Sequence, residues 1–99
     1  MVSRVAFLEV SPDRVDDVQQ VVRDIVDAGL RGEDGYVGYL VLGDRGSGRI
    51  IGITLWESEG AGKASDAKAA ILRPEVEQAT GGSIRAVEKY EVLYDVGRQ

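Results

Sequence analysis

The segment from Ile50 to Trp56 constrains the fold more than any other part of this chain. It reads Ile-Ile-Gly-Ile-Thr-Leu-Trp, which places apolar side chains on both faces of a predicted strand. A strand that is apolar on both faces has to be covered on both sides. A chain of 99 residues supports only one modest core. We therefore expect a partner, most simply a second copy, to cover one of the two faces.

The predicted elements follow the order strand, helix, strand, strand, helix, strand. Strands are expected over residues 5–10, 36–42, 49–56 and 83–96, and helices over residues 11–29 and 58–72. Gly29 is expected to end the first helix and Pro74 to break the second. This order predicts an α+β fold with a ferredoxin-like βαββαβ antiparallel sheet, in a single domain over residues 1–99.

Two helices can cover only one face of such a sheet, yet the first three predicted strands are apolar on both faces. Large exposed apolar patches are rare on monomeric proteins. The pattern predicts a homodimer in which two sheets pack together about a twofold axis, with the long last strand reaching onto the neighbour. A monomer with an apolar outer sheet face is the alternative.

Charge and composition argue against several classes of partner. The net charge of -5 at pH 7 disfavours nucleic acid and anionic lipid surfaces. The apolar runs are far shorter than the roughly 20 residues of a membrane-spanning helix, and the N-terminus lacks a signal-peptide pattern. These features predict a soluble, cytoplasmic protein. The chain has no histidine and no cysteine, and also no asparagine, so we expect no bound metal and no cofactor.

The candidate residues for a ligand site are a few aromatic side chains and one carboxylate. Trp56 is the only tryptophan, and it could stack on an aromatic ligand or simply pack in the core. Tyr36, Tyr39 and Tyr90 could hold a substrate oxygen, although cross-strand aromatic pairing also explains them. Glu88 interrupts the apolar register of the last strand. A buried carboxylate there could act as a catalytic base, while pairing with a cation or exposure at the rim is the alternative.

Further features concern how the elements begin and end. The third predicted strand follows a glycine-rich hairpin and ends in Trp-Glu-Ser at residues 56–58. The first helix begins at Val-Ser-Pro-Asp, residues 10–13, and the last strand is unusually long. With the element order, these features resemble the antibiotic biosynthesis monooxygenase-like family of dimeric α+β barrels. The resemblance covers essentially the whole chain. It implies a pocket in each subunit between sheet and helices, with Trp56 matching a tryptophan that lines it.

The family includes cofactor-independent monooxygenases of electron-rich polycyclic phenols, heme-degrading enzymes and proteins without an assigned activity. The asparagine that the oxygenases place on the first strand has no counterpart here, where the strand offers Arg4, Ala6, Leu8 or Glu9. The heme-degrading members need a histidine on the second helix, where this chain has Ser65, Asp66 and Lys68. The resemblance therefore implies a homodimeric protein that binds a small aromatic or apolar ligand, without heme chemistry. Cofactor-independent monooxygenation is the catalytic hypothesis, and a non-catalytic binding or interaction module is the alternative.

Overall fold

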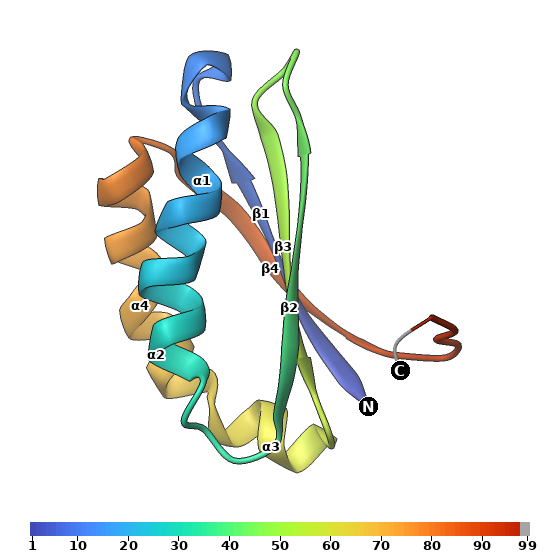
Figure 1. Ribbon diagram of the computed structural model, residues 1–99. Coiled ribbons are helices and arrows are strands. Elements are labelled where there is room, and N and C mark those ends of the chain that lie inside the picture. Colours follow the sequence, from blue (N-terminus) through green and yellow to red (C-terminus); the bar gives the residue numbers. More distant parts are fainter. Residues whose placement is uncertain (98–99) are drawn as a thin grey trace.

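The computed structural model describes residues 1–97 of the chain. A four-stranded antiparallel sheet, with strand order β2-β3-β1-β4, is covered on one face by helices (Figure 1). The strands are β1 (Val2–Glu9), β2 (Tyr36–Asp44), β3 (Arg49–Trp56) and β4 (Ser83–Glu91). The predicted α+β, ferredoxin-like βαββαβ fold is confirmed. Among the described residues, no helix is both long and apolar enough to cross a membrane.

The first helical region runs without interruption between β1 and β2. It consists of a 3-10 turn (Pro12–Arg14), α1 (Val15–Val21), a π-helical segment (Val22–Asp27) and α2 (Ala28–Leu30). The prediction that Gly29 ends this helix is wrong, because Gly29 lies inside α2. A Cβ atom at Gly29 would come within 2.8 Å of the Leu72 side chain. The glycine therefore allows close packing between the two helical layers instead of a stop.

The second helical region consists of α3 (Glu59–Ala64) and α4 (Asp66–Thr80). The prediction that Pro74 breaks the helix is wrong, because α4 continues through it. Pro74 and Ala70 are both exposed, so water can reach the Ala70 carbonyl that loses its N–H partner. The break falls instead at Ser65, whose hydroxyl donates to the carbonyl of Gly62 at 2.8 Å.

Strand β4 is shorter than predicted, and it contains a β-bulge. It ends at Glu91, so the prediction of a strand to residue 96 is wrong. The bulge pairs Leu8 with Ile84 and the adjacent Phe7 with Ala86. Since paired residues share a sheet face, Ile84 points toward the helices while Ala86 points away from them. The single apolar face predicted for this strand is therefore divided between the two sides of the sheet.

The sheet face opposite the helices is apolar and uncovered within residues 1–97 (Figure 1). Leu40 and Leu42 of β2 are 50% and 46% exposed, and the apolar side chains of β1 and β3 on this face are only partly buried. We call this surface the open sheet face. It consists of Val5, Phe7, Leu40, Leu42, Ile51 and Ile53.

Candidate functional site

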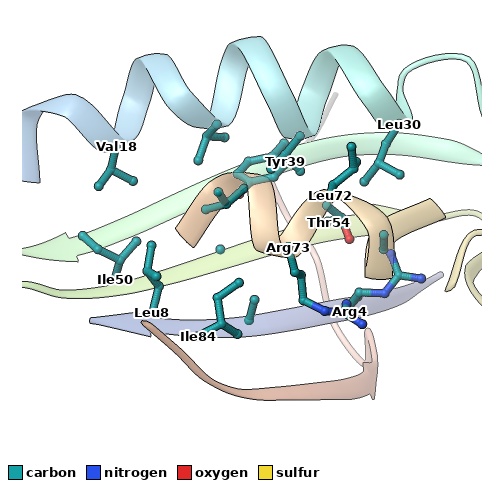
Figure 2. Close-up of a pocket in the computed structure, with 16 residues that line it drawn as sticks. Arg4, Leu8, Val18, Leu30, Tyr39, Ile50, Thr54, Leu72, Arg73 and Ile84 are labelled. Carbon is teal, nitrogen blue, oxygen red and sulfur yellow. The ribbon is translucent and has the colours of Figure 1, made fainter. Parts of the chain in front are cut away.

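An apolar cavity lies between the sheet and the helices (Figure 2). Its volume is about 80 Å³. Leu8 and Ile50 form part of its sheet side, Val18 and Leu72 form part of its helix side, and Ile84 reaches it from β4. Voids larger than a water molecule are few in protein interiors. This cavity is therefore the first candidate for a ligand site.

The size of the cavity limits what it can hold without rearrangement. A dry apolar cavity of about 150 Å³ accommodates benzene. The present cavity has about half that volume, so even a ligand with a single aromatic ring requires wall side chains to move. Two wall residues, Val22 and Val26, belong to the π-helical segment. Segments of π-helix are rare and occur frequently at functional sites. The least regular part of the helical layer thus borders the cavity.

Tyr39 is the predicted site residue that the structure places in the cavity wall. Its ring fits because residue 52 on the neighbouring strand is glycine: a Cβ atom there would lie 2.8 Å from the Tyr39 hydroxyl oxygen. Burial, with a smaller contribution from the charge of Asp27, raises the pKa of Tyr39 to about 12. At neutral pH this phenol is protonated, so it can donate a hydrogen bond but cannot act as a base.

Arg4 brings a buried positive charge to the cavity from β1. Arg4 as a whole is only 6% exposed. Nη2 donates to the Gly62 carbonyl at 2.8 Å, to Ser65 Oγ at 2.8 Å and to Asp66 Oδ1 at 2.6 Å. Nη1 is buried and has no hydrogen-bond partner among the described residues. One half of the guanidinium group thus holds the junction of α3 and α4, while the other half is unused.

The carboxylate of Asp66 balances the charge of Arg4 on the outer side. Lys89 of β4 also pairs with this carboxylate. Burial alone would raise the pKa of Asp66, but the hydrogen bonds from Lys89 and Arg4 lower it overall. Asp66 therefore stays ionised at neutral pH, and it neutralises the side of Arg4 that faces α4.

Trp56 and Tyr36 pack together at the α3 end of the sheet. Trp56 is fully buried, its Nε1 donates to Thr54 Oγ1 at 3.0 Å, and the Tyr36 ring meets it edge-on with the centroids 5.4 Å apart. The Tyr36 hydroxyl donates to Asp27 at 2.8 Å. Trp56 borders a separate cleft of about 440 Å³, which several charged residues also line, instead of the apolar cavity. Its link to the cavity is Arg4, whose Cζ lies 5.5 Å from the Trp56 ring centroid.

Tyr90 and Glu88 lie on β4, on the side of the sheet that faces away from the helices. Both are exposed, and the Tyr90 hydroxyl donates to Glu88 Oε1. That hydrogen bond raises the pKa of Tyr90. The structure therefore separates this pair from Tyr39 by the thickness of the sheet, whereas Tyr90 borders the same cleft as Trp56.

The cationic residues of the cavity were missed by sequence analysis. Arg4 alternates with Ala6 and Leu8 on an otherwise apolar strand face, so an inward-facing arginine was visible in the pattern. Arg73 of α4 also lines the cavity, but it precedes a proline that was expected to break the helix. Within residues 1–97, no group of three or more acidic, histidine or cysteine side chains is arranged to hold a metal ion.

Comparison with known proteins identifies the family. The model of the antibiotic biosynthesis monooxygenase family matches residues 1–73. An uncharacterized protein of Mycobacterium tuberculosis is 37% identical over 90 residues, which are 91% of this chain and 38% of that protein. The chain thus spans little more than a third of the length of this curated relative.

Two solved structures show the same fold. A monooxygenase of Streptomyces coelicolor in complex with nanaomycin D superposes with a TM-score of 0.73 at 16% identity, over 96% of this chain and 89% of that one. A heme-degrading protein of Mycobacterium tuberculosis with two hemes in its active site gives a TM-score of 0.67 at 24% identity, over 98% and 100% of the two chains. Because the family model matches most of its length, this chain belongs to the antibiotic biosynthesis monooxygenase family.

Proposed function

We propose that this protein is a homodimer that binds a small apolar or aromatic ligand between its sheet and its helices. The observation that supports this proposal best is the cavity, since an apolar void of about 80 Å³ is unusual in a close-packed core. The walls also contain polar groups, the Tyr39 hydroxyl and the Arg4 guanidinium, which could orient a ligand. A related fold in Streptomyces coelicolor holds nanaomycin D, an example of such a ligand.

The homodimer would cover the open sheet face. After β4 the chain leaves the sheet on the side away from the helices (Figure 1), and it presents Leu93 and Tyr94 with 86% and 85% exposure. A second copy related by a twofold axis would cover the open sheet face and could receive these side chains. Tyr90 and Glu88 would then lie at or beside the interface between the two sheets.

If the protein is an enzyme, the proposed reaction is cofactor-independent oxygenation of an electron-rich phenol. The bound phenol loses its proton, and a ring carbon of the resulting anion forms a bond to O₂. The peroxide takes a proton, and the hydroperoxide then loses water by cleavage of its O–O bond and of the C–H bond at the same carbon, which leaves a carbonyl group there and converts the phenol to a quinone. The substrate supplies all four electrons that reduce O₂, so no external reductant is required.

The alternative is a non-catalytic binding module, and the cavity chemistry offers specific support for it. Among the described residues, no aspartate or glutamate lines the cavity. Tyr39 is protonated at neutral pH, and the other ionisable wall residues are arginines, which do not act as bases. Deprotonation of a substrate would therefore need water as the proton acceptor, with the positive charge of the arginines lowering the pKa of the substrate.

Ligand binding is tested by the fluorescence of Trp56, the only tryptophan, because its ring centroid lies 5.5 Å from Cζ of the cavity residue Arg4. Small aromatic compounds should change its emission saturably, and Gly52→Ala should weaken their binding by about tenfold, because the added methyl group displaces the Tyr39 ring. Gly32→Ala is the matched control, since its methyl group meets nothing within 4 Å.

Oxygen uptake with anthrone-like phenols then separates the catalytic hypothesis from the non-catalytic binding module. Binding without oxygen uptake across a broad panel supports the binding module, and equal affinities for Gly52→Ala and wild type argue against this cavity.

Hemin should not form a saturable one-to-one complex with this protein. The chain has no histidine to ligate the iron, and a cavity of about 80 Å³ is far smaller than heme. An absorbance titration that shows no Soret shift at stoichiometric hemin is the expected result. Stoichiometric binding followed by reductant-dependent loss of the heme spectrum would contradict it.

A further inference from the structure

The unused half of the Arg4 guanidinium group indicates the charge of the ligand. Arg4 is more than nine-tenths buried, and its Nη1 has no partner among the described residues. A buried charged donor without an acceptor is destabilising, so each such group in a native protein needs an explanation. The nearby Trp56 ring contacts the guanidinium group at 5.5 Å, but a ring face is a weaker acceptor than an oxygen atom.

A second cation lies in the same wall, and unlike Arg4 it has no ion pair among the described residues. Arg73 of α4 lines the cavity, and its guanidinium group has no hydrogen bond or ion pair with any residue from 1 to 97. Figure 2 shows Arg73 and Arg4 extending toward the same end of the cavity. No carboxylate of the described chain lines this cavity, although the protein as a whole carries a net charge of -5. Positive charge is therefore concentrated at one end of an apolar chamber.

We infer that the ligand of this cavity has an apolar body and one anionic oxygen terminus, which accepts a hydrogen bond from Arg73 and, once wall side chains have moved to admit the ligand, from the buried Arg4 Nη1. This inference rests on the proposed function, because it names the ligand class for the same cavity. A planar guanidinium group donates two parallel hydrogen bonds to a carboxylate or one to a phenolate oxygen. The apolar walls around Leu8, Ile50 and Leu72 hold the rest of the molecule.

The same arrangement affects the catalytic hypothesis. The charge of Arg73, together with the side of Arg4 that does not face Asp66, would favour the ionised form of a bound phenol and lower the pKa of that phenol. The proton can leave to water, so the cavity does not need a carboxylate base. Arg4 would thus act on the substrate oxygen directly, from the inward-facing side of β1.

Matched neutral and anionic probes test the inference. Benzoate should bind at least about tenfold more tightly than benzyl alcohol, as expected for a charge-assisted hydrogen bond. Binding should also shift the ionisation of 4-nitrophenol to lower pH, which its visible absorbance reports. A preference for benzoate without the nitrophenol shift assigns a carboxylate ligand, and both effects together assign an anionic oxygen of either kind.

Substitutions identify the residues responsible. Arg73→Met should remove most of the preference for benzoate over benzyl alcohol, because it removes the wall cation that has no hydrogen bond or ion pair with residues 1–97. Lys68→Met removes the same charge from the same helix, outside the cavity, and should change neither affinity. Arg4→Lys keeps the charge and can still pair with Asp66, but it loses the free donor and should reduce the preference. Circular dichroism verifies that each variant is folded.

The possible failures are distinguishable. Equal affinity of wild type for benzoate and benzyl alcohol overturns the anionic terminus and leaves the apolar binding site standing. A preference that survives in both Arg73→Met and Arg4→Lys overturns the assignment to these two residues. Absence of binding by every probe, charged and neutral, overturns the proposed function together with the inference.

Discussion

Light scattering at micromolar concentration should report about twice the 10.7 kDa chain mass, and Ile53→Lys should reduce this to the mass of one chain. Ile53 is the central residue of the open sheet face, paired with Val5 on β1 and with Leu40 on β2. A lysine there would bury an unpaired charge between two apolar sheets, which costs several kcal/mol. Size-exclusion chromatography with light scattering measures both masses.

The control for this experiment is Ile71→Lys. Ile71 is 66% exposed on α4, so the same change in chemistry takes place in the helical layer, away from the open sheet face. This variant should remain a dimer. A wild-type monomer throughout a dilution series would contradict the two-sheet assembly, and a dimer that persists in Ile53→Lys would place the interface elsewhere.

Trp56→Ala should lower the free energy of unfolding by about 3–5 kcal/mol. Trp56 is fully buried, and the truncation removes its contacts with Tyr36, its hydrogen bond to Thr54 and the ring beside Arg4. Domains of this size have total stabilities of about 5–15 kcal/mol, so the loss takes a large share of the whole. Urea unfolding followed by far-ultraviolet circular dichroism measures it.

Trp56→Phe separates packing from hydrogen bonding at this position. Phenylalanine keeps an aromatic ring against Tyr36 but cannot donate to Thr54, so its cost should be clearly smaller than that of alanine. A ligand held by Arg4 should bind this variant more weakly, because the guanidinium group loses part of its aromatic support. For Trp56→Ala, a loss of unfolding free energy below about 1 kcal/mol would contradict the prediction, because it would mean that neighbouring side chains close the space left by the indole ring.

The fold was predictable from the sequence because most of its signals are local. Alternating and two-faced apolar patterns located the strands, and the element order led to the sheet topology. The errors occurred where tertiary contacts override local preference. Pro74 lies in α4 because its lost hydrogen bond is on the solvent side, and Gly29 lies in a helix because Leu72 packs against it.

The candidate site was less predictable, for reasons that concern register and side-chain contacts. Strand alternation suggested that Tyr90 belongs with the apolar side chains of β4, but the bulge beside Ile84 changes which face each later residue occupies. Tyr39 was named and lies in the cavity wall. Arg4 and Arg73 were not selected, because an unpaired nitrogen atom becomes visible only when its surroundings are known.

The central position of β1 has a consequence for how the chain folds. β1 is bonded to β3 on one side and to β4 on the other, and its pairing with β4 joins residues as distant as Val2 and Glu91. Such long loops have to close before the sheet is complete, which slows folding relative to chains dominated by local contacts. Until β4 docks, β1 presents a free edge of N–H and C=O groups to other chains. Self-association during synthesis or refolding is therefore expected to begin at this edge, and removal of residues 83–91 would expose it permanently.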